Sequence, residues 1–163
     1  MKDQIVIEGL LTSYIKINPE APKKLLFLHG WQSNSDLWRE IFSRLENSGY
    51  AIYALDLPGF GGTQAPKNAF SVGDYANFVK SFAEKMAIKD VVVVGHSFGG
   101  RVAIKLTAET KLVKQLVLVD SAGLIMKDKS ATRAIAKIAK PIFAPKFMQS
   151  IRRSVYKRLG STD

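Results

Sequence analysis

The feature that most constrains the fold of this chain is the alternation of short apolar runs with amphipathic stretches up to about residue 120. An N-terminal pair of runs, Ile5–Ile7 and Tyr14–Ile17, is typical of a hairpin. Four further strands are predicted at Leu25–Leu28, Tyr50–Leu57, Val91–Val94 and Gln115–Val119. Because helices of ordinary length separate these strands, right-handed crossovers are favoured. The sequence therefore predicts an α/β fold with a mainly parallel sheet and helices on both faces.

Three helices are predicted between these strands. Capping boxes at Ser33–Asp36 and Ser71–Asp74 indicate where the first two begin. A third is expected from Gly99 to about Ala108. The apolar positions of the first helix are Leu37, Trp38, Ile41, Phe42 and Leu45, and those of the second are Tyr75, Phe78, Val79, Phe82 and Met86.

Composition narrows the class of protein. The 163 residues are 47% hydrophobic and include no cysteine, which predicts one soluble globular domain without a thiolate metal site or a cysteine nucleophile. The N-terminus does not resemble a secretory signal, and no apolar run is long enough to span a bilayer. A cytoplasmic location is therefore expected.

The net charge of +10 is concentrated in the last forty residues, which hold 10 of the 24 basic and 2 of the 14 acidic side chains. We interpret residues 1–123 as the core and residues 124–163 as a basic helical segment, broken by Pro141 and Pro145. An anionic membrane, an acidic protein or a nucleic acid would each complement this charge, and a simple solvated helix face would also produce it. Nucleic acid ranks below the other partners because no nucleic-acid motif is present.

The candidate chemistry lies in the segment Gly95-His96-Ser97-Phe98-Gly99, which has the form G-x-S-x-G and stands between a buried strand and a helix. A serine at such a turn is held in a strained conformation that exposes its hydroxyl, and the flanking glycines leave room for the neighbouring backbone. The start of the helix directs free N–H groups toward an oxyanion formed there. Ser97 is thus the candidate nucleophile.

The order and spacing of three segments resemble the α/β-hydrolase family over roughly residues 5–123. The segments are Leu28-His29-Gly30-Trp31, Leu55-Asp56-Leu57-Pro58-Gly59-Phe60-Gly61 and Gly95-His96-Ser97-Phe98-Gly99-Gly100. The first two look most like small cytosolic esterases, including those that act on pimeloyl methyl esters carried by acyl carrier protein. The resemblance implies about six of the family's eight strands, followed by the start of a helical cap.

The same resemblance implies roles for individual residues. Ser97 would be the nucleophile, and the backbone amides of Trp31 and Phe98 would form the oxyanion hole. The resemblance implies structural rather than catalytic roles for the remaining motif residues, which are His29, Gly30, Gly95, His96 and Gly99. Epoxide hydrolases of this fold place Asp at the elbow, so a serine there favours acyl transfer from a small-molecule ester.

The catalytic set is incomplete in this chain. The family order is serine, acid, histidine, but the two histidines, His29 and His96, both precede Ser97. Asp120 follows the last predicted strand and is a candidate acid, although a loop aspartate capping backbone amides would look the same. We read Asp56 as a turn-forming residue.

Two functional hypotheses follow. The first is a serine hydrolase of carboxylic esters that is truncated within its cap and lacks the catalytic histidine, with an exposed sheet edge that promotes self-association. The second is a non-catalytic binding module, or half of a split hydrolase, whose basic tail docks on an anionic membrane or on an acidic partner such as acyl carrier protein. No cofactor is expected, because Gly59–Gly62 lacks dinucleotide-loop spacing and two separated histidines do not build a zinc site.

Overall fold

The computed structural model describes residues 2–123, and the predicted basic segment 124–163 lies outside these residues. The chain forms one six-stranded sheet with the order β1-β2-β4-β3-β5-β6. The strands are β1 (Asp3–Ile7), β2 (Leu10–Ile17), β3 (Lys23–Leu28), β4 (Tyr50–Leu55), β5 (Val91–His96) and β6 (Val113–Val119). The helices are the 3-10 helix η1 (Ser35–Trp38), α1 (Arg39–Leu45), α2 (Val72–Lys85) and α3 (Phe98–Glu109).

The sheet is mainly parallel, as the sequence predicts. Strands β4, β3, β5 and β6 run parallel to one another, whereas β1 and β2 form an antiparallel hairpin that joins the sheet through β4. Within residues 2–123, the edge strand β6 pairs with β5 alone. The α/β architecture is confirmed.

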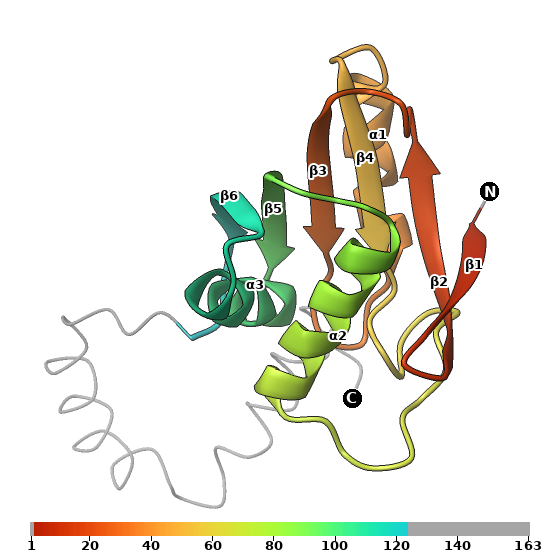
Figure 1. Ribbon diagram of the computed structural model, residues 1–163, viewed down its shortest axis with the longest axis vertical. Coiled ribbons are helices and arrows are strands. Elements are labelled where there is room, and N and C mark those ends of the chain that lie inside the picture. The colour runs from red at the N-terminus through yellow and green to blue at the C-terminus, as the bar shows by residue number, and fades with distance from the viewer. Residues whose placement is uncertain (1, 124–163) are drawn as a thin grey trace, which may run out of the picture. The chain divides into compact units, whose positions relative to one another are not determined.

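Helices cover both faces of the sheet, with α2 and α3 in front and α1 behind in Figure 1. The central strand β3 supplies both cores because successive side chains point to opposite faces. Leu26 and Leu28 pack in the core beneath α2 and α3, while Leu25 and Phe27 pack beneath η1 and α1. Burial of both faces explains why this strand reads as a continuous apolar run rather than as an alternating one.

The two predicted capping boxes have different outcomes. At α2 the box is present, because the Ser71 side chain accepts from the Asp74 amide and the Asp74 carboxylate accepts from the Ser71 amide. At the first helix the cap is Asn34 rather than Ser33, and its side chain accepts from the Asp36 amide at 2.8 Å.

A 3-10 turn opens this first helix before α1 begins at Arg39. Because a 3-10 helix has three residues per turn, it shifts the phase of the apolar pattern. Trp38 and Phe42 are buried, but Leu37 and Ile41 lie exposed at the surface, contrary to the prediction of one continuous buried face. No helix within residues 2–123 combines the length and the apolar character needed to cross a membrane.

Candidate active site

The strand order places the candidate site at a reversal of the chain path. From β3 the chain moves to β4 on one side, and it later returns to β5 on the other side of β3. Ligands of open parallel sheets bind beyond the carboxyl ends of the strands at such a switch point. The loop after β3 carries Gly30 and Trp31, and the turn after β5 carries Ser97 and Phe98. The topology therefore brings the two predicted oxyanion residues and the candidate nucleophile to one place.

Ser97 occupies a strained turn between β5 and α3. Its backbone has φ 48° and ψ −110°, a combination that L-residues rarely adopt. Hydrogen bonds hold it there: the Ser97 amide donates to the Val119 carbonyl at 3.0 Å, and the Ser97 carbonyl accepts from the Gly100 and Ala122 amides at 3.1 Å. The side chain makes no hydrogen bond within residues 2–123, and the residue is half-buried.

Three glycines let the backbone segments approach at this turn. A Cβ at Gly95 would lie 2.6 Å from Gly100 Cα, and a Cβ at Gly99 would lie 2.5 Å from the His29 carbonyl oxygen. A Cβ at Gly30 would lie 2.9 Å from His96 Nδ1 and 3.4 Å from Ser97 Cβ. The loop after β3 is therefore in direct contact with the turn that carries Ser97.

The backbone amides of Trp31 and Phe98 donate no hydrogen bond to any acceptor within residues 2–123. The Gly30 carbonyl, in contrast, accepts from the Ser33 amide at 3.3 Å and contacts His29 Nδ1 at 2.7 Å. The Gly30 C=O and the Trp31 N–H belong to one trans peptide and point in opposite directions. The Trp31 N–H therefore points away from Ser33 and His29. Two N–H groups are thus left for an external acceptor.

Both ring nitrogens of His29 are occupied. The Leu57 amide donates to Nε2 at 2.9 Å, so Nδ1 carries the proton and donates to the Gly30 carbonyl. Burial lowers the pKa of the His29 imidazole, which is fully enclosed, and this outweighs the opposing effects of the Gly30 carbonyl and Asp56. His29 is held neutral and joins the loop after β3 to the loop after β4.

His96 and Asp120 complete the predicted set. His96 lies beside Trp38, with ring centroids 6.3 Å apart, and its buried Nδ1 has no hydrogen-bond partner within residues 2–123. Asp120 follows β6 at the same edge of the sheet as Ser97, is exposed, and has φ 44°. Its carboxylate makes no hydrogen bond to the described part of the chain, so its role as an acid stays a prediction.

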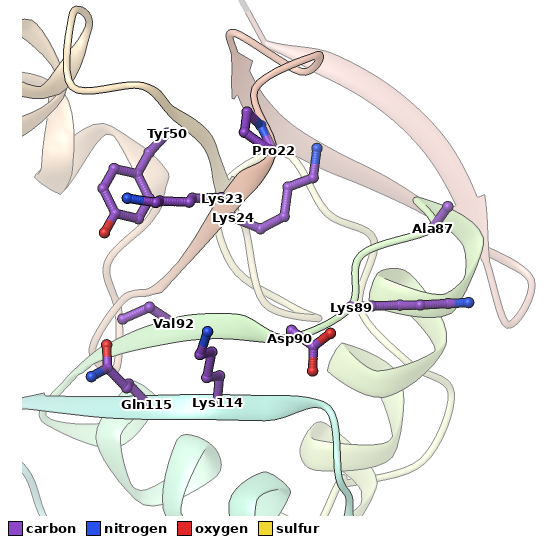
Figure 2. A pocket seen from close by; sticks show the side chains of 10 residues that line it. All are labelled: Pro22, Lys23, Lys24, Tyr50, Ala87, Lys89, Asp90, Val92, Lys114 and Gln115. Atoms are coloured by element: carbon purple, nitrogen blue, oxygen red, sulfur yellow. The ribbon is translucent and has the colours of Figure 1, made fainter.

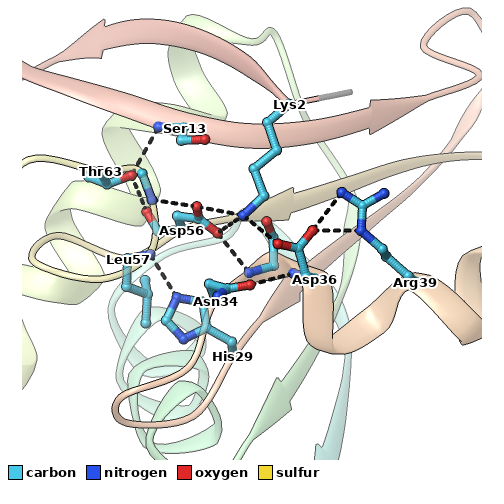
Figure 3. A network of polar contacts seen from close by, with 11 residues as sticks. Lys2, Ser13, His29, Asn34, Asp36, Arg39, Asp56, Leu57 and Thr63 are labelled. Atoms are coloured by element: carbon cyan, nitrogen blue, oxygen red, sulfur yellow. Dashed lines mark hydrogen bonds and ion pairs between the residues drawn. The ribbon is translucent and has the colours of Figure 1, made fainter.

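The sequence interpretation missed the role of Asp56, which is fully buried at the end of β4. Its carboxylate accepts from the Ser35 amide at 2.7 Å and the Gly62 amide at 2.9 Å, and it pairs with Lys2 Nζ at 2.9 Å. Lys2 also pairs with Asp36 at 3.1 Å. Figure 3 shows these contacts converging on Asp56. Asp56 is a junction between the N-terminus and the two loops at the site rather than a simple turn residue.

The electrostatics of Asp56 follow from these contacts. Burial alone would raise the pKa of its carboxyl, but hydrogen bonds from Gly62 and Ser35, together with Lys2, outweigh burial and hold the pKa below its usual value. The sequence did hold a signal. Asp56 directly follows a buried strand, at the edge of the sheet where polar groups gather.

A hollow of about 520 Å³ lies near the amino ends of the parallel strands, at the end of the sheet opposite to the candidate site. Its lining includes Lys23, Lys89 and Lys114. In Figure 2 the amino groups of Lys23 and Lys89 extend in different directions, and Lys23 lies over the Tyr50 ring at 5.6 Å. The hollow contains none of the predicted site residues.

Comparisons with known proteins agree with this fold. A family model described as the alpha/beta hydrolase fold matches residues 23–162. An uncharacterized protein of Mycobacterium tuberculosis is 32% identical over 149 residues, covering 85% of this chain and 43% of that protein. A soluble epoxide hydrolase of Corynebacterium sp. is 29% identical over 142 residues, covering 86% of this chain and 49% of that protein.

Among solved structures, the crystal structure of a membrane phospholipase A described as a bacterial virulence factor is similar, with a TM-score of 0.74 and 30% identity. The match covers 80% of this chain and 42% of the phospholipase chain. This chain belongs to the alpha/beta hydrolase fold family. It spans about half the length of the curated relatives it matches.

Proposed function

We propose that this chain carries the nucleophile and the oxyanion hole of a serine hydrolase that cleaves carboxylic esters. The observation that carries the proposal is the strained Ser97, next to two backbone amides that have no acceptor within residues 2–123. A preorganised pair of donors aimed at a developing oxyanion is usually the largest single contribution to acyl-transfer catalysis.

In the proposed reaction, Ser97 and the two backbone amides act on the ester carbonyl group. Ser97 Oγ attacks the ester carbonyl carbon while a general base takes the hydroxyl proton. The carbonyl oxygen becomes an oxyanion that accepts hydrogen bonds from the Trp31 and Phe98 amides. The C–O bond to the alcohol then breaks, and the alcohol leaves with the proton from the base. Water, activated by the same base, attacks the acyl-Ser97 ester and releases the carboxylic acid.

The general base is assigned to a group outside these 163 residues. His29 uses both ring nitrogens in hydrogen bonds to the backbone. The His96 Nδ1 is buried against Gly30, on a residue adjacent to Ser97 whose side chain packs beside Trp38. The sequence contains no other histidine.

Two considerations support an ester rather than an epoxide as the substrate. A phospholipase A, by its name an enzyme that hydrolyses esters, shares 30% identity with this chain. The soluble epoxide hydrolase is also similar, but family members that open epoxides use an aspartate at the elbow, where this chain has Ser97.

Chemical rescue tests the proposal. The chain is incubated with 4-nitrophenyl acetate and increasing imidazole, which replaces the missing base, and release of nitrophenolate is followed. Removing catalytic side chains in serine hydrolases leaves a rate about 10³-fold above water from the oxyanion hole and binding. We therefore expect an imidazole-dependent rate well above that of imidazole alone.

Ser97→Ala is the matched control, because it retains the fold and both amides while removing the nucleophile. Its imidazole-dependent rate should fall well below that of the wild-type chain and keep only the residual acceleration that the two amides give without a nucleophile. Equal rates for the wild-type chain and Ser97→Ala at every imidazole concentration would refute Ser97 as the nucleophile.

A further inference from the structure

A continuous cluster of aromatic rings borders the candidate site. Trp31 makes edge contacts with Phe60 and Phe98, with ring centroids 4.9 Å and 5.1 Å apart. Phe98 also contacts Tyr75 at 5.1 Å. Although two rings hold its side chain, Trp31 stays 59% exposed as a residue. Because two rings hold it and its remaining surface is open, the Trp31 ring is free to receive a further aromatic ring in an edge or offset contact.

The cluster is rigid because its members belong to different anchored segments. Phe60 lies in the loop after β4, where its amide donates to the Leu57 carbonyl at 2.9 Å. The Tyr75 hydroxyl, on α2, donates to the Pro58 carbonyl at 3.2 Å and ties this loop to the helix. A prearranged ring surface loses little conformational entropy when a ligand binds.

The position of the cluster relates it to the reaction. The residues whose amides form the candidate oxyanion hole, Trp31 and Phe98, are the same residues whose rings touch. An ester whose carbonyl oxygen sits on those amides would therefore lie beside two residues of the cluster. Within residues 2–123, the neighbouring side chains leave more than half of Trp31 uncovered.

We propose that Trp31 is a specificity-determining residue that selects esters carrying an aryl group, by adding that group to the aromatic cluster. Aromatic pairs gain attraction beyond their buried area through edge-to-face and offset contacts, which a saturated ring of similar size lacks. This contribution corresponds to a preference of roughly 3- to 10-fold in affinity. The role in catalysis rests on the proposed function, whereas binding of the aryl group does not require acylation.

The test uses the full chain with Ser97→Ala, so that no acyl group is transferred. The sequence has two tryptophans, and Trp38 is only 3% exposed while Trp31 is 59% exposed. Their indole N–H signals are followed by ¹⁵N NMR, assigned with Trp31→Phe, and titrated separately with ethyl phenylacetate and ethyl cyclohexylacetate. We expect a saturable shift of the Trp31 signal, an unchanged Trp38 signal, and about 3- to 10-fold tighter binding of the phenyl ester.

Two variants sharpen the result. Trp31→Ala should abolish the preference for the phenyl ester, measured by ligand-observed NMR, while the matched Trp38→Phe should leave both affinities unchanged. Equal affinities for the two esters, or a preference that survives Trp31→Ala, would overturn the inference. A Trp31 signal that neither ester shifts would also overturn the inference, and it is the result expected if another part of the protein covers the ring.

The two proposals fail separately. If aryl binding at Trp31 holds but Ser97 is never acylated, the proposed function falls and the binding site stands. If Ser97 is acylated without a preference at Trp31, the specificity inference alone falls.

Discussion

At the residue scale, Ser97 has a backbone conformation that favours glycine over any residue with a side chain. Such strain costs about 1–3 kcal/mol and persists because the Val119 carbonyl and the Gly100 and Ala122 amides hold the turn. We therefore interpret the strained turn as a feature that lowers the stability of the fold but exposes the Ser97 hydroxyl.

Replacing Ser97 by glycine should relieve this strain. After allowance for the extra chain entropy of glycine in the unfolded state, Ser97→Gly should be more stable than Ser97→Ala by about 1 kcal/mol. Urea denaturation of the two variants measures the difference. Equal stability, or a more stable alanine variant, would mean that the turn is not strained.

The ion pair between Lys2 and buried Asp56 should stabilise the fold more than a surface pair does. Lys2→Met leaves the Asp56 carboxylate with backbone donors alone and should lower the free energy of unfolding by about 2 kcal/mol. Lys16→Met is the matched control, because Lys16 pairs with the exposed Asp3 at 3.5 Å and should cost less than about 0.5 kcal/mol. Similar losses in both variants would contradict the buried junction.

The lowered pKa of Asp56 predicts a specific pH dependence. A carboxylate whose pKa is lower in the folded state contributes stability above its unfolded pKa of about 4, and this contribution is lost as pH falls through the folded value. Asp56→Asn removes that contribution. Its free energy of unfolding should therefore fall less steeply below about pH 4 than that of the wild-type chain, in urea titrations from neutral to acid pH. Parallel curves would count against the assignment.

At the element scale, two helical glycines make opposite predictions. A Cβ at Gly99 would press on the carbonyl oxygens of Leu28 and His29, which are backbone atoms of the central strand and its end. Gly99→Ala should therefore cost about 2 kcal/mol or more. At Gly73 in α2 the nearest atom would lie 3.5 Å away, so Gly73→Ala should stabilise by about 0.5–1 kcal/mol. Thermal unfolding of both variants tests the pair, and a tolerated Gly99→Ala would contradict the close approach.

The elements also show how far the sequence predicts the structure. Strands and α2 follow from periodicity and from the Ser71 capping box because these are local signals. The 3-10 turn before α1 was not predicted, since Ser33 and Asn34 are both good caps and tertiary contacts decide between them. The motif identified Ser97 as a candidate, whereas the contacts of Asp56 with Lys2 and of Trp31 with Phe60 join residues far apart in sequence.

At the scale of the whole molecule, we expect the edge strand β6 to promote association between copies of the chain. Val117 and Val119 are 44% and 40% exposed on a strand that pairs only with β5 within residues 2–123. Unpaired edges with apolar side chains favour association between copies. We expect sedimentation coefficients that rise with protein concentration, and a weaker rise for Val117→Lys.

The control for this prediction is Leu37→Lys, which changes a similarly exposed apolar side chain on η1. It should associate like the wild-type chain. A single concentration-independent species for the wild-type chain would show that β6 does not promote association.

The location of the acyl group after incubation with 4-nitrophenyl acetate and imidazole shows directly whether Ser97 is the nucleophile. Peptide mass mapping compares the wild-type chain with Ser97→Ala. We expect an acetyl group on Ser97 that is absent from the variant, because Ser97 directly precedes Phe98 and contacts the loop that carries Trp31. Acetylation confined to surface lysines and identical in both proteins would show that Ser97 is not the nucleophile.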